Sequence, residues 1–165
     1  TIYMPRNGCL RVLDPARGDK QIYAKLPAVL THAIPLSDPS RIMVGTEQPA
    51  IPMFFSEPAH EWCYYYTKAG LAQQQGNYKQ VVILGDEAKS LGFTPQDQNE
   101  WLVFIDGYAR AGDLQTAGEL SKTALAEDER IRRGVCTVWE QIQAQSGGGS
   151  EGQIMEIRGL LNCNP

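Results

Sequence analysis

The spacing of apolar positions along the chain changes near residue 59. From there on, apolar side chains recur every three to four residues, which is the spacing of one face of a helix. The first such stretch runs from Trp62 to Gln75 and stops at Gly76-Asn77, and a second runs from Val81 to Gly92. The pattern therefore predicts two helices joined by a tight turn.

A second pair of helices follows the turn at Thr94-Pro95. Its first helix carries apolar positions from Trp101 to Ala109 and ends at Gly112, and its second runs from Leu114 to Leu125. The two pairs match at an offset of 36 residues, as Gly76 with Gly112, Leu84 with Leu120, Ala88 with Ala124 and Tyr65 with Trp101. Self-similarity at such a period is typical of stacked helical hairpins.

Two further helices are expected after the second pair. Residues 128–145 carry Ile131, Val135 and Trp139 on one face, which predicts a helix that caps the stack. The glycine- and serine-rich stretch 146–150 predicts a flexible linker, and 154–161 a short last helix. The expected fold is therefore mainly α, with at least five helices between residues 59 and 162.

The first 58 residues predict a different kind of structure. Eight of the ten prolines lie there, which favours short extended pieces, turns and brief helices. Residues 27–33 are expected to form a short helix, and Leu10–Leu13 and Arg41–Val44 are strand-like. This stretch is too short and too rich in proline to bury its own core. We therefore expect residues 1–58 to form an N-terminal arm that packs on a helical domain of residues 59–165.

The helical part resembles the tetratricopeptide repeat family. The residues that carry the resemblance are Trp101, Phe104, Tyr108, Gly112, Asp113, Ala117 and Ala124, together with Ala69, Ala72, Gly76, Asn77, Tyr78 and Ala88 in the first pair. The resemblance implies stacked hairpins whose small residues, such as Ala117, let paired helices approach closely. Departures are Val81 at a position usually alanine, Gly85 within a helix and a spacing of 36 residues, so a generic paired-helix repeat is the alternative.

The whole chain also resembles the soluble extracytoplasmic tail of certain bacterial multi-pass membrane proteins, some of them glycosyltransferase-like. The likeness rests on residues 9–15, on Pro35-Leu36-Ser37 and on residues 60–66, which lead into the helical hairpins. It implies a periplasmic or cell-surface location and attachment to a larger membrane protein. A cytoplasmic location is the alternative.

Composition and charge narrow the class of partner. The chain of 165 residues is 42% hydrophobic and 21% charged, which excludes a disordered, fibrous or membrane-spanning chain. Its net charge of −4 lacks the basic excess of proteins that bind phosphate backbones. Nucleic acid is therefore not expected as a partner.

The four cysteines, Cys9, Cys63, Cys136 and Cys163, lie far apart and form no Cys-x-x-Cys motif. Neither a metal nor a cofactor is therefore expected. Four cysteines allow three sets of two disulfides, and four buried free thiols are the alternative. We predict the pairs Cys9–Cys63, which would tie the arm to the helices, and Cys136–Cys163, which would tie the last helix to the cap.

One arrangement would suit catalysis. His60 and Cys63 fall one turn apart at the start of a helix, next to Glu61, where a thiol pKa is lowered, as in a cysteine hydrolase. A plain helix start is the alternative, and a disulfide at Cys63 would remove the nucleophile. The glycine run 147–149 lacks the Lys-Ser/Thr of a phosphate loop and is interpreted as a linker. We therefore expect a chain without enzymatic activity of its own.

Aromatic side chains on the first helices of the two pairs are the candidate binding residues. Tyrosine and tryptophan are frequent in protein interfaces, and the groove candidates are Tyr64, Tyr65, Tyr66, Trp101 and Tyr108. The predicted function is an interaction module that docks a protein, a peptide or the rest of its own polypeptide. The alternative is an accessory domain that positions the substrate of a membrane-bound glycosyltransferase-like enzyme.

Overall fold

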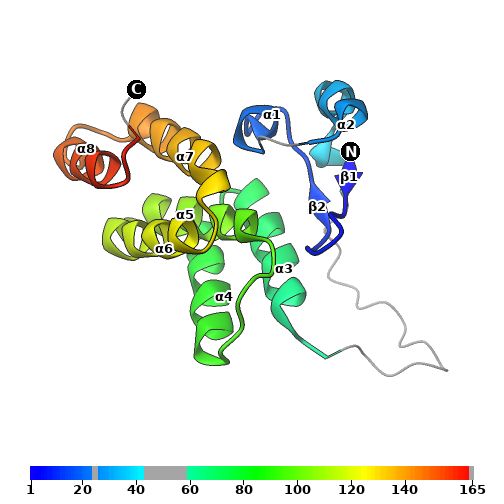
Figure 1. The fold of residues 1–165 in the computed structure, drawn as a ribbon, viewed down its shortest axis with the longest axis horizontal. Coiled ribbons are helices and arrows are strands. Elements are labelled where there is room, and N and C mark those ends of the chain that lie inside the picture. The colour runs from blue at the N-terminus through cyan, green and yellow to red at the C-terminus, as the bar shows by residue number, and fades with distance from the viewer. Residues whose placement is uncertain (24–25, 43–58, 164–165) are drawn as a thin grey trace.

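The computed structural model describes residues 1–23, 26–42 and 59–163, and in these ranges the chain is mainly helical (Figure 1). Six helices of ten to fourteen residues follow residue 59: α3 (Trp62–Gln74), α4 (Tyr78–Ser90), α5 (Trp101–Arg110), α6 (Leu114–Glu127), α7 (Arg132–Gln145) and α8 (Glu151–Leu160). The prediction of at least five helices is confirmed. None of the helices in the described ranges has the length and apolar character needed to cross a membrane.

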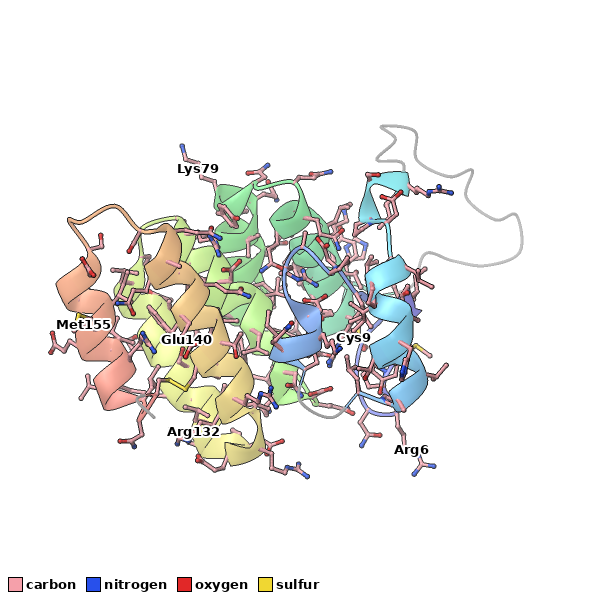
Figure 2. All side chains as sticks on the ribbon, turned by 90° about the horizontal axis from the view of Figure 1, so that it is seen from above. Arg6, Cys9, Lys79, Arg132, Glu140 and Met155 are labelled. Carbon is pink, nitrogen blue, oxygen red and sulfur yellow. A yellow bond between two sulfur atoms is a disulfide. The ribbon has the colours of Figure 1, made fainter. Side chains whose placement is uncertain are left out.

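Helix α5 lies at the centre of the helical part. It packs against α3 and α4 on one side and against α6 and α7 on the other, and α8 packs on α6 and α7. Figures 1 and 2 show the helices following one another across the molecule, with α8 at one side and the N-terminal residues at the other. Because other helices pack on all sides of α5, every residue from Trp101 to Ala109 is buried.

The turns within the two predicted pairs are built alike. Gly76 and Gly112 both have positive φ angles, 69° and 98°, which glycine adopts without steric cost. In each turn the next N–H bonds the carbonyl five residues back, Asn77 to Ala72 and Asp113 to Tyr108, which ends the helix. Asn77 and Asp113 then cap the following helix by accepting a backbone N–H with their side chains. The 36-residue offset therefore corresponds to equivalent turns.

The N-terminal segment, residues 1–23 and 26–42, contains short elements. Strand β1 (Ile2–Tyr3) pairs antiparallel with β2 (Arg11–Val12), and the helical pieces are α1 (Asp19–Ile22), α2 (Ala28–Ala33), η1 (Ile34–Leu36) and η2 (Pro39–Arg41). The predictions of a strand at 10–13 and a helix at 27–33 are confirmed in position. The strand predicted at Arg41–Val44 is wrong at Arg41, where Pro39 and the capping Asp38 favour a 3₁₀ turn. Met43 and Val44 lie outside the described residues.

The N-terminal segment packs against α3 and α7. Strand β2 contacts α3, and α1 contacts α7. Leu13, Ile22 and Ile34 are buried and belong to the same hydrophobic core as the helices. Among the other apolar residues of the expected arm, Val12, Leu26 and Leu30 are half-buried and Ile42 is exposed, while Met43, Val44, Met53, Phe54 and Phe55 lie outside the described residues.

Both predicted disulfides are present, and the alternative of four free thiols is wrong. Cys9 bonds Cys63 at the start of α3, so the strand pair is tied to the helices. Cys136 in α7 bonds Cys163 just after α8. Disulfides of this kind are typical of proteins that fold in an oxidising compartment.

Candidate functional site

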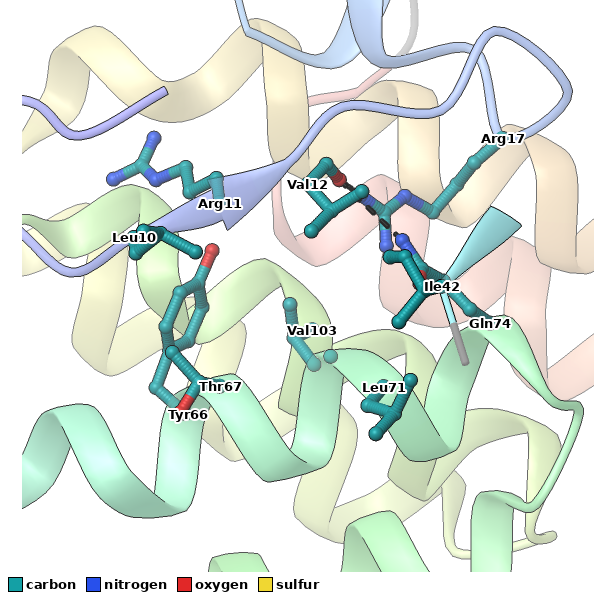
Figure 3. Close-up of a pocket in the computed structure, with 11 residues that line it drawn as sticks. Leu10, Arg11, Val12, Arg17, Ile42, Tyr66, Thr67, Leu71, Gln74 and Val103 are labelled. Carbon is teal, nitrogen blue, oxygen red and sulfur yellow. Dashed lines mark hydrogen bonds between the residues drawn. The ribbon is translucent and has the colours of Figure 1, made fainter. Parts of the chain in front are cut away.

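A cavity of about 180 Å³ lies between β2 and α3. Figure 3 shows side chains from both elements and from α5 converging on it. Its wall is mainly apolar and includes Val12, Ile42, Tyr66, Leu71 and Val103. A cavity of this size and character accommodates one aliphatic or aromatic side chain.

Gly70 forms part of the wall that α3 contributes. A Cβ atom built on this glycine meets no heavy atom within 4 Å, so the backbone of α3 borders open space there. One turn earlier, the Thr67 hydroxyl donates to the Cys63 carbonyl at 2.7 Å. The Thr67 hydroxyl is therefore satisfied within the helix, and the cavity wall remains mainly apolar.

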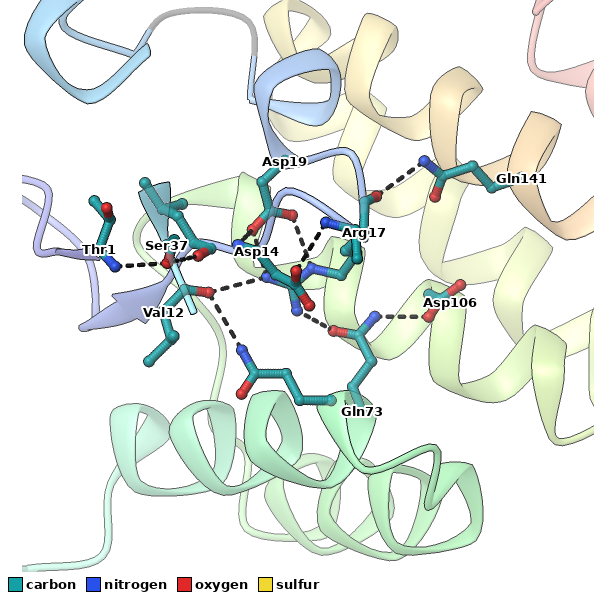
Figure 4. A network of polar contacts seen from close by, with 12 residues as sticks. Thr1, Val12, Asp14, Arg17, Asp19, Ser37, Gln73, Asp106 and Gln141 are labelled. Carbon is teal, nitrogen blue, oxygen red and sulfur yellow. Dashed lines mark hydrogen bonds and ion pairs between the residues drawn. The ribbon is translucent and has the colours of Figure 1, made fainter. Parts of the chain in front are cut away.

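Arg17 lies at the edge of this cavity and anchors the N-terminal segment on three helices (Figure 4). Its guanidinium forms two hydrogen bonds of 2.7 Å with Asp19 and donates to Gln73 of α3 at 2.6 Å. Gln73 in turn donates to Asp106 of α5 at 2.6 Å, and Gln141 of α7 donates to the Arg17 carbonyl at 3.0 Å. One loop is thus held by α3, α5 and α7.

The charge of Arg17 is stabilised by its partner. Burial by itself disfavours the charged guanidinium, but the hydrogen bonds and the negative charge of Asp19 outweigh that effect and raise the pKa of Arg17 above its ordinary value. Asp19 is itself fully buried and also accepts the Asp14 backbone N–H at 2.7 Å. The pair therefore serves as a structural anchor.

A second cluster of polar contacts surrounds the buried residue Glu100. Its carboxylate accepts the Cys9 backbone N–H at 2.6 Å and the Trp62 indole N–H at 2.5 Å. Arg11 approaches it to 3.6 Å, forms an ion pair with Asp97 and lies over the Tyr23 ring. Burial raises the pKa of Glu100, while the two N–H donors and Arg11 act in the opposite direction.

The five aromatic residues predicted to line a groove lie mainly in the core. Tyr65, Tyr66, Trp101 and Tyr108 are buried, with exposed fractions between 1% and 6%. Tyr64 is half-buried and stacks on His60, with ring centroids 3.7 Å apart. Because α5 is covered on every side and the N-terminal segment packs on α3, these four side chains are largely enclosed, and Tyr66 also lines the cavity between β2 and α3.

The pairing of Cys63 with Cys9 bears on the hydrolase hypothesis. Among the described residues no cysteine is free, so Cys63 offers no thiol to act as nucleophile with His60 in this structure. In the same part of the chain no group of three or more His, Cys, Asp or Glu side chains lies close enough to hold a metal ion.

The sequence patterns did not predict the roles of the buried polar residues Arg11, Asp19, Glu100 and Asp106, or of the half-buried Arg17. A signal was present, because Glu100 and Asp106 flank apolar helix positions that are otherwise uninterrupted from Trp101 to Ile105. A carboxylate at such a position requires a buried partner.

No family model, no curated protein and no solved structure matches this chain.

Proposed function

We propose that this chain is a docking module that binds a protein or peptide segment by taking one of its apolar side chains into the cavity between β2 and α3. The observation that carries the proposal is the cavity of about 180 Å³, whose wall is mainly apolar and borders open space at Gly70. Burial of a leucine- or phenylalanine-sized side chain there contributes about 1.5–3 kcal/mol of binding free energy before entropic costs.

We further propose that the pairs α3–α4, α5–α6 and α7–α8 form a tetratricopeptide-like stack. The contacts of α3 with α5 and of α5 with α7 support this arrangement, because they join the first helices of successive pairs. The equivalent turns at Gly76 and Gly112 also support it. In this proposal the N-terminal segment covers the face formed by α3, α5 and α7, and the cavity is a docking point beside it.

The two disulfides support a function outside the cytoplasm, in the periplasm or at the cell surface. Attachment to a larger membrane protein is part of the same proposal and is tested by fractionating cells that express the full-length gene. The alternative, a domain that positions a sugar substrate, needs polar groups that bind hydroxyls, whereas the cavity wall is mainly apolar.

Selection of random peptides displayed on phage against the oxidised protein tests the docking proposal. Gly70→Leu extends a side chain into the cavity, and Gly159→Leu makes the same change on α8, where a Cβ also meets nothing within 4 Å. We expect selected peptides to share an apolar residue, to bind wild type and Gly159→Leu with equal Kd, and to lose at least tenfold in affinity for Gly70→Leu. A selection without enriched peptides, or peptides that bind Gly70→Leu unchanged, would reject the proposal.

A further inference from the structure

The Cys9–Cys63 disulfide forms part of the wall of a second cavity, of about 410 Å³. Around the two cysteines the wall includes the polar residues Arg6, Asn7 and Gln96. This cavity shares no lining residue with the docking cavity between β2 and α3. The disulfide is therefore reachable from solvent at a place that the proposed function does not use.

The two cysteines of this disulfide differ in their exposure to solvent and in their electrostatic environment. Cys63 is exposed and is the second residue of α3, where the helix N-terminus favours a thiolate. Cys9 is 3% exposed and belongs to the hydrophobic core, where a thiolate is disfavoured. An incoming thiolate therefore reaches Cys63, and Cys9 needs a proton when it leaves.

Glu100 is positioned to supply that proton. Its Oε2 atom lies 3.4 Å from the Cys9 sulfur, and its side chain is fully buried. The charged and titratable groups that face it are Arg11 on β2, Asp97 in the preceding turn and Tyr66 on α3. Burial raises the pKa of Glu100, while the Cys9 and Trp62 N–H donors and Arg11 act in the opposite direction.

We propose that Cys9–Cys63 is a thiol–disulfide exchange site, reduced by a dithiol that attacks Cys63, with Glu100 as the proton donor to Cys9. The reductant is a dithiol such as an oxidoreductase with two neighbouring cysteines. The Cys136–Cys163 disulfide is structural, and in this proposal it stays oxidised. Reduction at the first site removes the covalent link between the N-terminal segment and α3.

The exchange proceeds in two displacements. A thiolate of the reductant bonds to the Cys63 sulfur, the bond to Cys9 breaks, and its electron pair leaves on Cys9, which takes the Glu100 proton. The second thiol of the reductant loses its proton to water and attacks the mixed disulfide, so that Cys63 leaves as a thiolate and is protonated by water. Glu100 regains a proton from water. The dithiol has lost two electrons and become a disulfide, and the protein has gained two thiols.

Reduction of the folded protein by dithiothreitol tests the site, with Cys136–Cys163 as the internal control. Thiols are trapped by alkylation at successive times and assigned by peptide mass spectrometry. We expect Cys9 and Cys63 to become alkylated together, at least ten times faster than Cys136 and Cys163. Equal rates, a faster Cys136–Cys163 pair, or reduction of Cys9–Cys63 only in denaturant would overturn the proposal.

The single variants Cys9→Ser and Cys63→Ser test which sulfur is attacked. We expect the thiol of Cys63 in Cys9→Ser to react with a small aromatic disulfide reagent at least ten times faster than the thiol of Cys9 in Cys63→Ser. Comparable reactivity, or a faster Cys9, would contradict attack at Cys63. This comparison does not depend on the stability of any Glu100 variant.

The role of Glu100 is tested by the pH dependence of the reduction rate, corrected for the thiolate fraction of dithiothreitol. For wild type the corrected rate should fall as pH rises through the raised pKa of Glu100, because the proton donor is lost. Glu100→Gln should remove this dependence, and Glu61→Gln, a carboxyl change in the same cavity, should retain it. A corrected wild-type rate without pH dependence, or the same dependence in Glu100→Gln, would show that Glu100 donates no proton.

Discussion

Two glycines in the helical pairs have a packing role that sequence propensity alone does not reveal. A Cβ atom on Gly107 of α5 would lie 2.2 Å from Val81 Cγ1, and one on Gly85 of α4 would lie 2.9 Å from Phe104 Cδ1. Both clashes occur where α4 packs on α5. Gly85 weakens α4 by about 1 kcal/mol in propensity, and in return it allows this close approach. Gly85 is therefore favoured by its packing against α5, where a larger side chain would clash.

Gly107→Ala and Gly70→Ala should change stability in opposite directions. We expect Gly107→Ala to lower the free energy of unfolding by about 1–3 kcal/mol, because the buried Val81 must shift. Gly70→Ala should raise it by up to about 1 kcal/mol, because α3 gains helix propensity and the new methyl group meets only space. Urea unfolding measures both, and a loss of equal size in both variants would contradict the packing argument.

At the scale of elements, the turn that ends α8 positions a residue that attaches this helix to the rest of the fold. Asn162 follows α8 with a φ of 54°, the left-handed conformation that ends a helix, and the Cys163 N–H bonds the Arg158 carbonyl at 2.9 Å. This turn directs Cys163 toward Cys136 in α7. Non-covalent support includes Arg158, which approaches Glu140 to 3.4 Å, and Arg132, which donates to the Leu161 carbonyl. The disulfide thus adds a covalent attachment to the packing of Ile154 and Leu161 in the core.

The double variant Cys136→Ala/Cys163→Ala should free α8 before the rest of the fold. The 27-residue separation of the two cysteines gives a loss of about 3–4 kcal/mol in unfolding free energy in the chain-entropy model. Hydrogen exchange should increase in α8 first, while the amides of α3 and α5 keep their protection under native conditions. Uniformly faster exchange in all helices would show that α8 is integral to one cooperative unit.

At the scale of the whole molecule, buried polar contacts join segments that lie far apart in the chain. Arg17 bonds Gln73, 56 residues away, and Gln141 bonds the Arg17 carbonyl across 124 residues. Glu100 likewise joins α5 to the backbone of Cys9 and to Trp62 of α3. The position of the N-terminal segment on the helices is therefore fixed by hydrogen bonds as well as by apolar contact.

Arg17→Met should be strongly destabilising, because it leaves the buried carboxylate of Asp19 without its cation. We expect a loss of about 3–5 kcal/mol in unfolding free energy, typical of breaking a buried ion pair. The double variant Arg17→Met/Asp19→Asn should regain part of it. Arg41→Met, which removes an exposed pair with Asp38, should cost about 0–1 kcal/mol. Equal effects at Arg17 and Arg41 would show that the Arg17 pair is not an anchor.

Buried tyrosines should make the fold sensitive to alkali. Burial raises the pKa of Tyr66, and burial together with the hydrogen bond to Asp86 raises the pKa of Tyr108. A phenol whose pKa is raised by folding stabilises the fold fully below the unfolded pKa of about 10, and this contribution is lost as pH rises above it.

Loss of helical circular dichroism above about pH 10 should therefore accompany the tyrosinate absorbance of the buried rings. Tyr108→Phe should move the midpoint of this transition to higher pH, because one buried phenol no longer ionises. Ionisation of all seven tyrosines before any loss of helix would contradict the burial of Tyr66 and Tyr108.

The sequence by itself determined the helices from residue 62 onward and their turns, and it allowed three sets of two disulfides, of which the predicted set is present. Apolar periodicity and residues such as Gly76 and Asp113 act within a few positions, so they can be recognised without knowing the fold. The Cys136–Cys163 pair could be predicted because it closes the end of the chain on an adjacent helix.

Only the tertiary structure decided which helix faces are covered and where the buried charges pair. Periodicity shows that α5 has one apolar face, but four neighbouring helices bury its other faces as well, so Trp101 and Tyr108 became core. Arg17 and Glu100 gave no local sign of their partners, because burial of an ion depends on segments brought together from distant parts of the chain. Apolar patterning is local, whereas desolvation and pairing belong to the assembled molecule.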